Sequence, residues 1–274
     1  MKLATVDLMP RIGTEIKTDK TALLSGTHAR QIRTLLEQRG VLLFRGIEFN
    51  DDEEIAFAAT LGAPREEFGH RSMAITPDKK INPIFADYFD ANIFWHIDGA
   101  WEDVPPLASI LTPRVLSSTG GQTEFANAYA AYEDLPEADK KLLQGLKAVH
   151  SMEAAVGPAF ANPTEDQRRA WRNYPEKIHP LIWHHRSGGK SLALSSTISH
   201  VLDMDREESD ALLRRLMEFA TRRKFVYQHQ WQMNDVLMWN NTGTIHRVLP
   251  FDKGSGRTLQ RVTLLGEEPL ADAA

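Results

Sequence analysis

The sequence predicts a mainly β protein with flanking helices, built as an antiparallel sandwich or barrel with the helices packed outside. Strand-like segments fill the last part of the chain, whereas helical patterns lie early and in the middle. The alternating strand–helix order of a parallel doubly wound sheet is missing. The glycine-containing segment GSGR follows a predicted strand but does not open a helix, as a phosphate-binding loop would.

The composition is that of an ordinary globular protein. The chain has 274 residues, of which 42% are apolar and 25% charged, and its net charge is -5. This acidic balance argues against nucleic acid as a partner, and no apolar run approaches the roughly 20 residues of a membrane span. We find no repeat or long linker, so we expect one domain over 1–274, located in the cytoplasm. Cysteine is absent, so a metal would have to be held by His, Asp or Glu.

Two helices and a strand are predicted before residue 63. The amphipathic segment 28–40 predicts a helix that ends at its last glycine, and 41–46 follows as a short buried strand. Segment 50–62 predicts a second helix. Its N-cap would be Asn50, with Glu53 three residues later as in a capping box.

The middle of the chain is less regular. Residues 63–92 have mixed polar and aromatic character with little periodicity, so we expect a long loop, and long loops in compact domains are often functional. Segments 107–115 and 122–128 predict strands on either side of the turn STGG. Residues 128–180 predict an insertion of helices and loops, with a helix break near Pro136.

The clearest helix is predicted at 205–223, where Asp205 and Glu208 form a capping pair and apolar residues recur on one face. A strand-like segment at 191–197 precedes it. The strands predicted after it are 224–231, 235–241, 244–248 and 259–266.

The segment IFWHIDGAW, residues 93–101, carries an imidazole and a carboxylate in apolar surroundings. Its alternation predicts a strand, and residues i and i+2 of a strand point to the same face, so His96 and Asp98 would project together. One imidazole and one carboxylate make two-thirds of a facial triad for non-haem Fe(II). The alternative is a buried histidine hydrogen-bonded to a neighbouring aspartate, which needs no metal.

A third candidate ligand and two arginines lie near the end of the chain. His246 is predicted on a short strand after a turn, Arg257 comes eleven residues later, and Arg261 four residues further. An even spacing puts both arginines on one strand face. A guanidinium that faces the interior needs an anionic partner, and Arg can grip a carboxylate through two parallel hydrogen bonds. The alternative for Arg261 is a solvated strand face.

This order of motifs resembles the Fe(II)/2-oxoglutarate-dependent dioxygenases of the taurine and 2,4-dichlorophenoxyacetate dioxygenase family. The likeness extends over nearly the whole chain, although 63–92 does not match. GGQTEF and FVYQHQW resemble the aryloxyacetate branch in particular. The segments that carry the likeness are GVLLFRG, STGGQTEFANAYAAYEDLP, HPLIWHHRSGGKSLAL and FVYQHQWQMNDVLMWNNTGTIHRV.

The resemblance implies a double-stranded β-helix (jelly-roll) core, with Fe(II), 2-oxoglutarate as cosubstrate, and O2. In the family 63–92 would be the active-site loop that shapes the substrate pocket. One departure is Asn240, where the family commonly has Asp. The implied metal ligands, which are also the catalytic residues, are His96, Asp98 and His246. The implied cosubstrate-binding residues are Thr123, Arg257 and Trp239, and the substrate-binding candidates are Arg261, Asn92 and His70.

We therefore expect an enzyme that hydroxylates a small organic anion. An aryloxyalkanoate, cleaved at its ether bond, is the favoured class, and an alkylsulfonate is the alternative. Retention of Asp98 favours hydroxylation over halogenation, whereas desaturation stays open. Other classes are a non-catalytic jelly-roll binding protein, which would have little reason to keep the full set, and a metal hydrolase, which leaves Arg257 and Thr123 unexplained. The family also leaves a homo-oligomer open.

Overall fold

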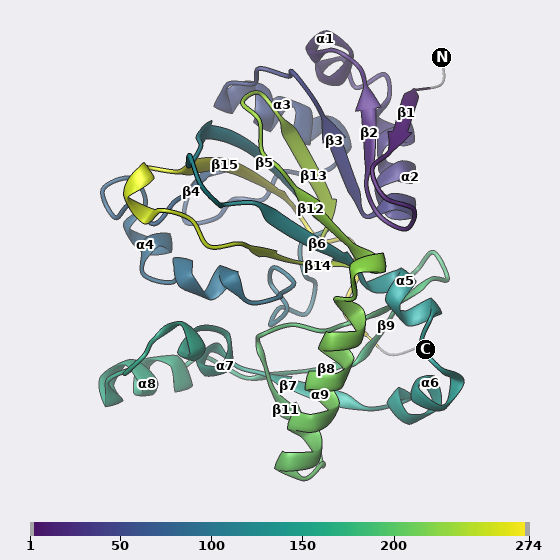
Figure 1. The fold of residues 1–274 in the computed structure, drawn as a ribbon, viewed down its shortest axis with the longest axis vertical. Helices are drawn as coiled ribbons and strands as arrows, with labels where there is room; N and C mark the ends of the chain where they lie inside the picture. The colour runs from purple at the N-terminus through teal and green to yellow at the C-terminus, as the bar shows by residue number, and fades with distance from the viewer. Residues whose placement is uncertain (1–2, 272–274) are drawn as a thin grey trace.

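The computed structural model describes residues 3–271, and its central feature is a large, mostly antiparallel sheet (Figure 1). Every pairing in this seven-stranded sheet is antiparallel except that of β2 with β3. In spatial order its strands are β1 (Ala4–Asp7), β2 (Thr14–Lys17), β3 (Val41–Phe44), β13 (Val236–Asn240), β5 (Ala108–Val115), β15 (Thr258–Leu264) and β4 (Met73–Ile75).

Three smaller sheets accompany it. The first packs against the large sheet, and the other two lie below it together with α9 in the view of Figure 1. The first has β12 (Val226–His229), β6 (Thr123–Asn127) and β14 (Thr244–Val248); the second has β11 (Ile198–Val201), β7 (Lys147–His150) and β8 (Lys177–Pro180); the third has β10 (Lys190–Leu192) and β9 (Ile182–His184).

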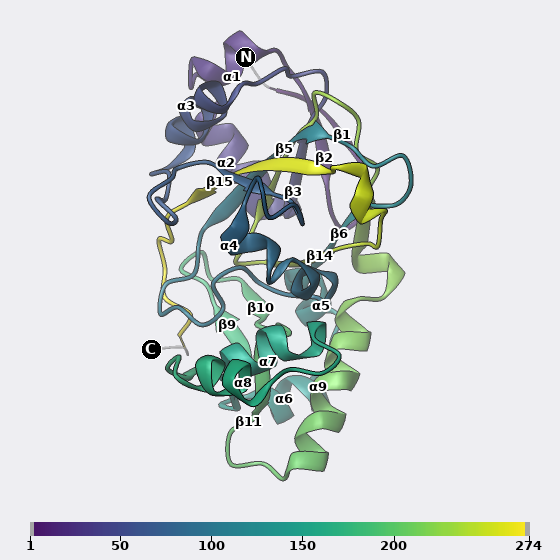
Figure 2. The ribbon, with the colours of Figure 1, turned by 90° about the vertical axis from the view of Figure 1, so that its left-hand side faces the viewer.

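Helices gather at two ends of the molecule, α1 to α3 at one and α6 to α9 at the other (Figure 2). Within residues 3–271, no helix has both the length and the apolarity needed to cross a membrane. The α-helices are α1 (Lys20–Leu24), α2 (Ala29–Arg39), α3 (Asp51–Leu61), α4 (Pro83–Ala86), α5 (Ala128–Glu133), α6 (Glu137–Leu143), α7 (Met152–Val156), α8 (Glu165–Arg172) and α9 (Arg206–Ala220). The 3-10 helices are η1 (Phe89–Ile93), η2 (Gly157–Ala159), η3 (Arg223–Phe225) and η4 (Lys253–Ser255).

The middle of the large sheet is buried on both faces, which explains the continuous apolar runs in β3 and β13. On β13, Val236 and Met238 belong to the cluster formed with α2 and α3, whereas Leu237 and Trp239 belong to the cluster formed with the β12–β6–β14 sheet. Alternate residues of a strand point to opposite faces, so an amphipathic pattern would leave one of these layers polar. The mainly β class with flanking helices is confirmed.

The early helices begin and end where the sequence predicts. Asn50 accepts a hydrogen bond from the Glu53 backbone, and the Glu53 side chain accepts from the Asn50 N–H, so the capping box is present. Gly40 follows α2 with φ +71°, a conformation that suits glycine. The predicted helix at 205–223 is α9, with Asp205 as N-cap.

Three predicted segments look different in the structure. Residues 63–92 are not one irregular loop, because they contain β4, α4 and the start of η1. Residues 128–180 include the strands β7 and β8 besides helices. The prediction of a strand over 93–101 is wrong: η1 runs into it, and only His96 pairs, in an isolated bridge. Gly99, at φ +65°, starts a turn that carries the chain away from the sheet.

Candidate metal centre and its relatives

His96 and His246 are joined through their backbones. Each residue donates its N–H to the carbonyl of the other, at 3.0 Å and 2.9 Å. This bridge lies beside β14 and brings the two imidazole centroids to 4.2 Å. The pairing therefore fixes the direction of the His96 side chain, as the predicted strand was expected to do.

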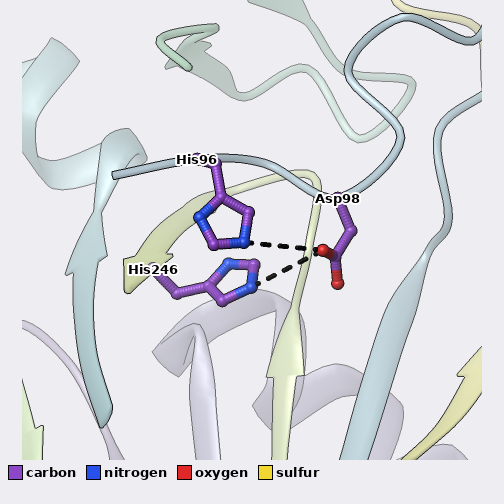
Figure 3. A group of neighbouring side chains, drawn as sticks. All are labelled: His96, Asp98 and His246. Atoms are coloured by element: carbon purple, nitrogen blue, oxygen red, sulfur yellow. Dashed lines mark ion pairs between the residues drawn. The ribbon is translucent and has the colours of Figure 1, made fainter. Parts of the chain in front are cut away.

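Asp98 completes the cluster (Figure 3). Its Oδ1 lies 3.7 Å from Nε2 of His96 and 3.7 Å from Nε2 of His246. One ligand atom of each residue falls within 4.8 Å of the other two, and no second group of this kind occurs in residues 3–271. The three side chains that the sequence predicts as metal ligands thus meet at one point.

The orientation of His96 suits a metal. Its Nδ1 lies 2.8 Å from the Phe94 carbonyl, which can only accept, so Nδ1 donates to this carbonyl and Nε2 is the nitrogen that faces Asp98. Nε2 of His246 faces the same carboxylate oxygen. Two ring nitrogens and one oxygen therefore converge, so the donor set fits a bound metal.

The charge states fit as well. Burial, together with His96, lowers the pKa of His246 to about 3, so this ring is a neutral ligand near neutral pH. Burial opposes ionisation of Asp98, but Arg261 and the two histidines outweigh it and hold the pKa of the carboxyl below its usual value. Two imidazoles and one carboxylate are the donor set of non-haem Fe(II) sites.

Asn241, which sequence reasoning did not single out, holds Asp98 in place. Its side chain accepts from the Asp98 N–H at 3.0 Å and donates to the Asp98 carbonyl at 2.9 Å and the Pro106 carbonyl at 3.0 Å. Its neighbour Asn240, the departure from the family pattern, accepts from the backbone and side chain of Thr242. Asn240 therefore stabilises the turn before β14.

Arg257 and Thr123 are linked by Trp231, which lines a pocket with Arg257 and donates to Thr123. Arg257 is 2% exposed, donates to the Gly121 carbonyl at 2.9 Å, and takes part in no ion pair within the described chain. Burial lowers its pKa to about 10. A pocket of about 220 Å³ is lined by Arg257, Gly121 and Trp231. A buried guanidinium without a counter-ion is costly, so the site suits an anionic ligand.

Thr123 is prepared as a hydrogen-bond donor. Its Oγ1 accepts from the indole N–H of Trp231 at 3.0 Å. Because that bond uses an acceptor position, the hydroxyl proton stays available for another group. Trp231 is thus a second residue that sequence reasoning missed, and its contact across the sheet leaves no pattern in the sequence.

The remaining predicted residues differ in their surroundings. The ring of Trp239 packs 4.7 Å from that of His246, and its indole N–H is buried without a partner. Asn92 donates to the Phe89 carbonyl at 2.8 Å within η1. His70 is exposed on a turn, and no side-chain hydrogen bond of His70 is found among the described residues.

Arg261 lies next to the triad. Its Nη1 is 3.5 Å from Asp98 Oδ2, its Nη2 donates to Glu67 Oε2 at 3.0 Å, and its Nε is buried without a partner. Burial works against the charge, but Asp98 and Glu67 keep the pKa of Arg261 above its usual value. The guanidinium faces the interior, which excludes the solvated strand face considered for the sequence.

Residues 4–263 match the sequence model of the family described as taurine catabolism dioxygenase TauD, TfdA family. The chain belongs to this family. It is 34% identical to an alpha-ketoglutarate-dependent 2,4-dichlorophenoxyacetate dioxygenase of Burkholderia sp. (strain RASC), over 89% of this chain and 87% of the relative. It is 32% identical to an alkylsulfatase of Acinetobacter baylyi, over 95% and 84%.

Solved structures of TauD/TfdA proteins have the same fold. The structure of AAD-2 in complex with Mn(II) and N-oxalylglycine covers 99% of this chain and all of its own, with a TM-score of 0.85 and 30% identity. This TauD/TfdA chain is therefore a 2-oxoglutarate-dependent dioxygenase that uses Fe(II) and O2, as its motifs predict.

Proposed function

We propose that this dioxygenase oxidises a small organic anion that carries an aromatic ring, with aryloxyalkanoates as the leading class. The observation that carries the proposal is Arg261, a largely buried guanidinium 3.5 Å from the carboxylate of the candidate triad. An anion bound there would hold its neighbouring carbon next to the metal centre.

Aromatic side chains support a ring-bearing substrate. Phe85 of α4 lies 6.0 Å from the Arg261 guanidinium, and Phe89 follows at a centroid distance of 5.8 Å in an edge-to-face contact. Phe251 packs 5.7 Å from Phe89 and lies 4.8 Å from the guanidinium of Arg257. An aromatic row thus connects the two buried arginines, and an aryl group would pack well along it.

The roles of the other residues follow from their chemistry. We assign His96, Asp98 and His246 as iron ligands, and when bound the iron supplies oxidation coupled to the decarboxylation of 2-oxoglutarate to succinate. Arg257 and Thr123 would hold the distal carboxylate of the cosubstrate, next to Trp239. Arg261 would hold the substrate carboxylate, so that its methylene faces the triad. Hydroxylation beside an ether oxygen gives a hemiacetal, which collapses to a phenol and glyoxylate.

Two further assignments belong to the proposal. The two facing sheets, with Leu237 and Trp239 on one and Phe125 on the other, support a double-stranded β-helix core. We also assign residues 1–274 to one catalytic domain, because strands from its beginning and its end share the large sheet. The segment 63–92 would border the substrate, since Glu67 and Phe85 both lie near Arg261.

A second candidate is oxidation of an alkyl sulfate or sulfonate. Relatives with the names alkylsulfatase and alpha-ketoglutarate-dependent sulfate ester dioxygenase are 32% and 31% identical to this chain. A guanidinium binds a sulfate group as readily as a carboxylate, so Arg261 could serve either class.

The test is substrate-dependent succinate formation. The enzyme, loaded with Fe(II) and 2-oxoglutarate in air, would be offered phenoxyacetates, alkyl sulfates and alkylsulfonates one at a time. We expect succinate and a phenol in equal amounts with a phenoxyacetate. Coupled succinate with the sulfur compounds alone would replace the leading class by the second candidate. Succinate with none of them would reject both.

A further inference from the structure

Arg261 already has an anionic partner from the protein itself. The carboxylate of Glu67 accepts from Nη2 of Arg261 at 3.0 Å, and both side chains are largely buried. An anionic substrate that approaches Arg261 therefore meets a guanidinium whose outer edge is occupied. The metal-side edge is occupied as well, by Asp98 at 3.5 Å.

The backbone places Glu67 at this position. Glu67 and His70 exchange backbone hydrogen bonds of 2.8 Å and 2.9 Å, and between them Phe68 and Gly69 have φ values of +51° and +81°. This is the geometry of a tight two-residue hairpin turn. Phe68 at its tip is 70% exposed.

Both sides of the turn are fixed to the strand that carries Arg261. Before the turn, the Arg65 N–H donates to the Thr263 carbonyl at 2.7 Å. After it, Met73 of β4 pairs directly with Arg261 of β15. The short turn can therefore reach only the neighbourhood of Arg261, and the ion pair is a consequence of the fold.

The guanidiniums around Glu67 already have carboxylate partners. Arg65 makes a two-pronged ion pair with Glu102, at 2.8 Å and 2.9 Å, and its Nε lies 3.7 Å from the Glu67 carboxylate. Two guanidiniums thus face two carboxylates, in addition to Asp98. A further anion would gain little attraction in such a cluster unless one of the carboxylates withdrew.

We propose that Glu67 is a specificity-determining residue that competes with the anionic substrate for Arg261. This inference rests on the proposed function of Arg261. Glu67 makes one hydrogen bond to the guanidinium, whereas the Nε–H of Arg261 has no partner. A substrate that binds through two parallel hydrogen bonds can satisfy this edge better than Glu67 does. The internal carboxylate lowers the affinity for every anion, and only those that bind in this two-pronged way overcome it.

Replacement of Glu67 should consequently improve binding, which is not the effect of structural damage. The amide in Glu67→Gln can still accept from Arg261, but it carries no charge, so it is a weaker competitor. We expect the dissociation constant of phenoxyacetate to fall roughly tenfold, the difference between a charged and a neutral hydrogen bond. Phenoxyacetamide, which has no charge, should bind equally to both proteins.

The matched control is Glu66→Gln. Glu66 is exposed and directly precedes the same turn, and its replacement removes the same charge from the protein. A second control is Glu67→Gln in an Arg261→Ala background, where the gain should vanish. Binding is measured without turnover, under anaerobic conditions. The enzyme loaded with Fe(II) and 2-oxoglutarate is titrated with phenoxyacetate, and the shift of its visible charge-transfer absorption band gives the dissociation constant.

The outcomes separate this inference from the proposed function. Tighter binding of phenoxyacetate to Glu67→Gln, but not to Glu66→Gln, supports the role of Glu67, even if no product forms in air. The absence of product in air would reject only the proposed substrate class. Equal or weaker binding to Glu67→Gln overturns the competition. So does a lack of binding in every variant, because an Arg261 freed from Glu67 should accept an anion.

Discussion

At the scale of single residues, neighbouring groups hydrogen-bond to one atom of a site residue and leave another donor or acceptor of that residue free. The Phe94 carbonyl accepts a hydrogen bond from Nδ1 of His96, so Nε2 is the nitrogen available to a metal. The indole N–H of Trp231 donates to the hydroxyl oxygen of Thr123, so the hydroxyl proton is available to a ligand. Asn241 fixes the backbone of Asp98 in the same way. The candidate ligands are therefore oriented before any ion or substrate arrives.

Arg257 should control affinity for the cosubstrate. We expect Arg257→Gln to raise the KM for 2-oxoglutarate by roughly 10- to 100-fold, because a charge-assisted bond of about 1.5–3 kcal/mol is lost. The KM for the prime substrate should change much less. Steady-state kinetics with each substrate varied in turn measures both effects. Arg222→Gln, which removes an arginine stacked on Phe219 at the surface, is the control. An unchanged 2-oxoglutarate KM would refute this role for Arg257.

Trp231 should act through Thr123. Trp231→Phe keeps most of the ring but removes the N–H, so the hydroxyl of Thr123 is free to rotate, and we expect a rise of about 3- to 10-fold in the KM for 2-oxoglutarate. In Thr123→Ala the same replacement should have no further effect. A double-mutant cycle measures this coupling. Independent, additive effects of the two replacements would show that Trp231 acts by another route.

At the scale of elements, the sequence predicts helix boundaries well where they depend only on residues close together in the chain. The caps of α3 and α9 and the end of α2 need only neighbouring residues, and all three lie where predicted. The strand expected at 93–101 failed because alternation alone cannot show that η1 and the turn at Gly99 interrupt it. His96 and Asp98 still converge, because a single bridge to β14 replaces the strand.

The contacts around the candidate site that escaped prediction are those between distant segments. Glu67 meets Arg261 through the pairing of β4 with β15, and Trp231 meets Thr123 beside the pairing of β12 with β6. Neither contact leaves a periodic pattern or a spacing in the sequence. The convergence of the candidate triad was predictable, because a metal site without cysteine is restricted to few residue types and the motifs resemble those of the family.

The helix α3 contains a buried carboxylate that should make stability depend on pH. Glu54 accepts from Thr112 at 2.7 Å and from Arg114 at 3.2 Å, but its Oε1 is buried without a partner. Burial raises its pKa to about 8, although Thr112 and Arg114 act in the opposite direction. In the unfolded chain the pKa of a glutamate is about 4.3, so between these values the folded protein binds more protons than the unfolded one.

The sign of the effect follows. The free energy of unfolding should fall as pH rises from about 5 to 8, by an amount on the order of a few kcal/mol, and the loss is complete above the folded pKa. Glu54→Gln keeps both hydrogen bonds but removes the titration, so its stability relative to the wild type should increase over this range. Urea unfolding at several pH values measures the difference. Asp52→Asn, at the exposed start of α3, is the control, and a constant difference for Glu54→Gln would contradict the prediction.

At the scale of the whole molecule, the candidate metal centre joins parts of the chain that the sequence separates widely. His96 and Asp98 come from the segment after η1, whereas His246 comes from β14, whose sheet packs against the large sheet through Phe125 and Trp239. An ion held by all three residues would connect the two segments. Because the unfolded chain cannot bring these ligands together, metal binding should stabilise only the folded state.

Metal should therefore raise the melting temperature. At a concentration of Mn(II) about 100 times its dissociation constant, linkage gives about 2.7 kcal/mol, which corresponds to a rise of roughly 5–10 °C for a chain of this size. The measurement is a thermal melt of metal-free protein, in anaerobic buffer, with and without Mn(II). In His96→Ala the rise should largely disappear, while the melting temperature of the metal-free variant should stay near that of the metal-free wild type. His28→Ala, at a site distant in sequence and absent from the triad, should respond to Mn(II) like the wild type. If His96→Ala kept the full rise, the ion would be bound elsewhere, and the triad would lose its role as the metal centre.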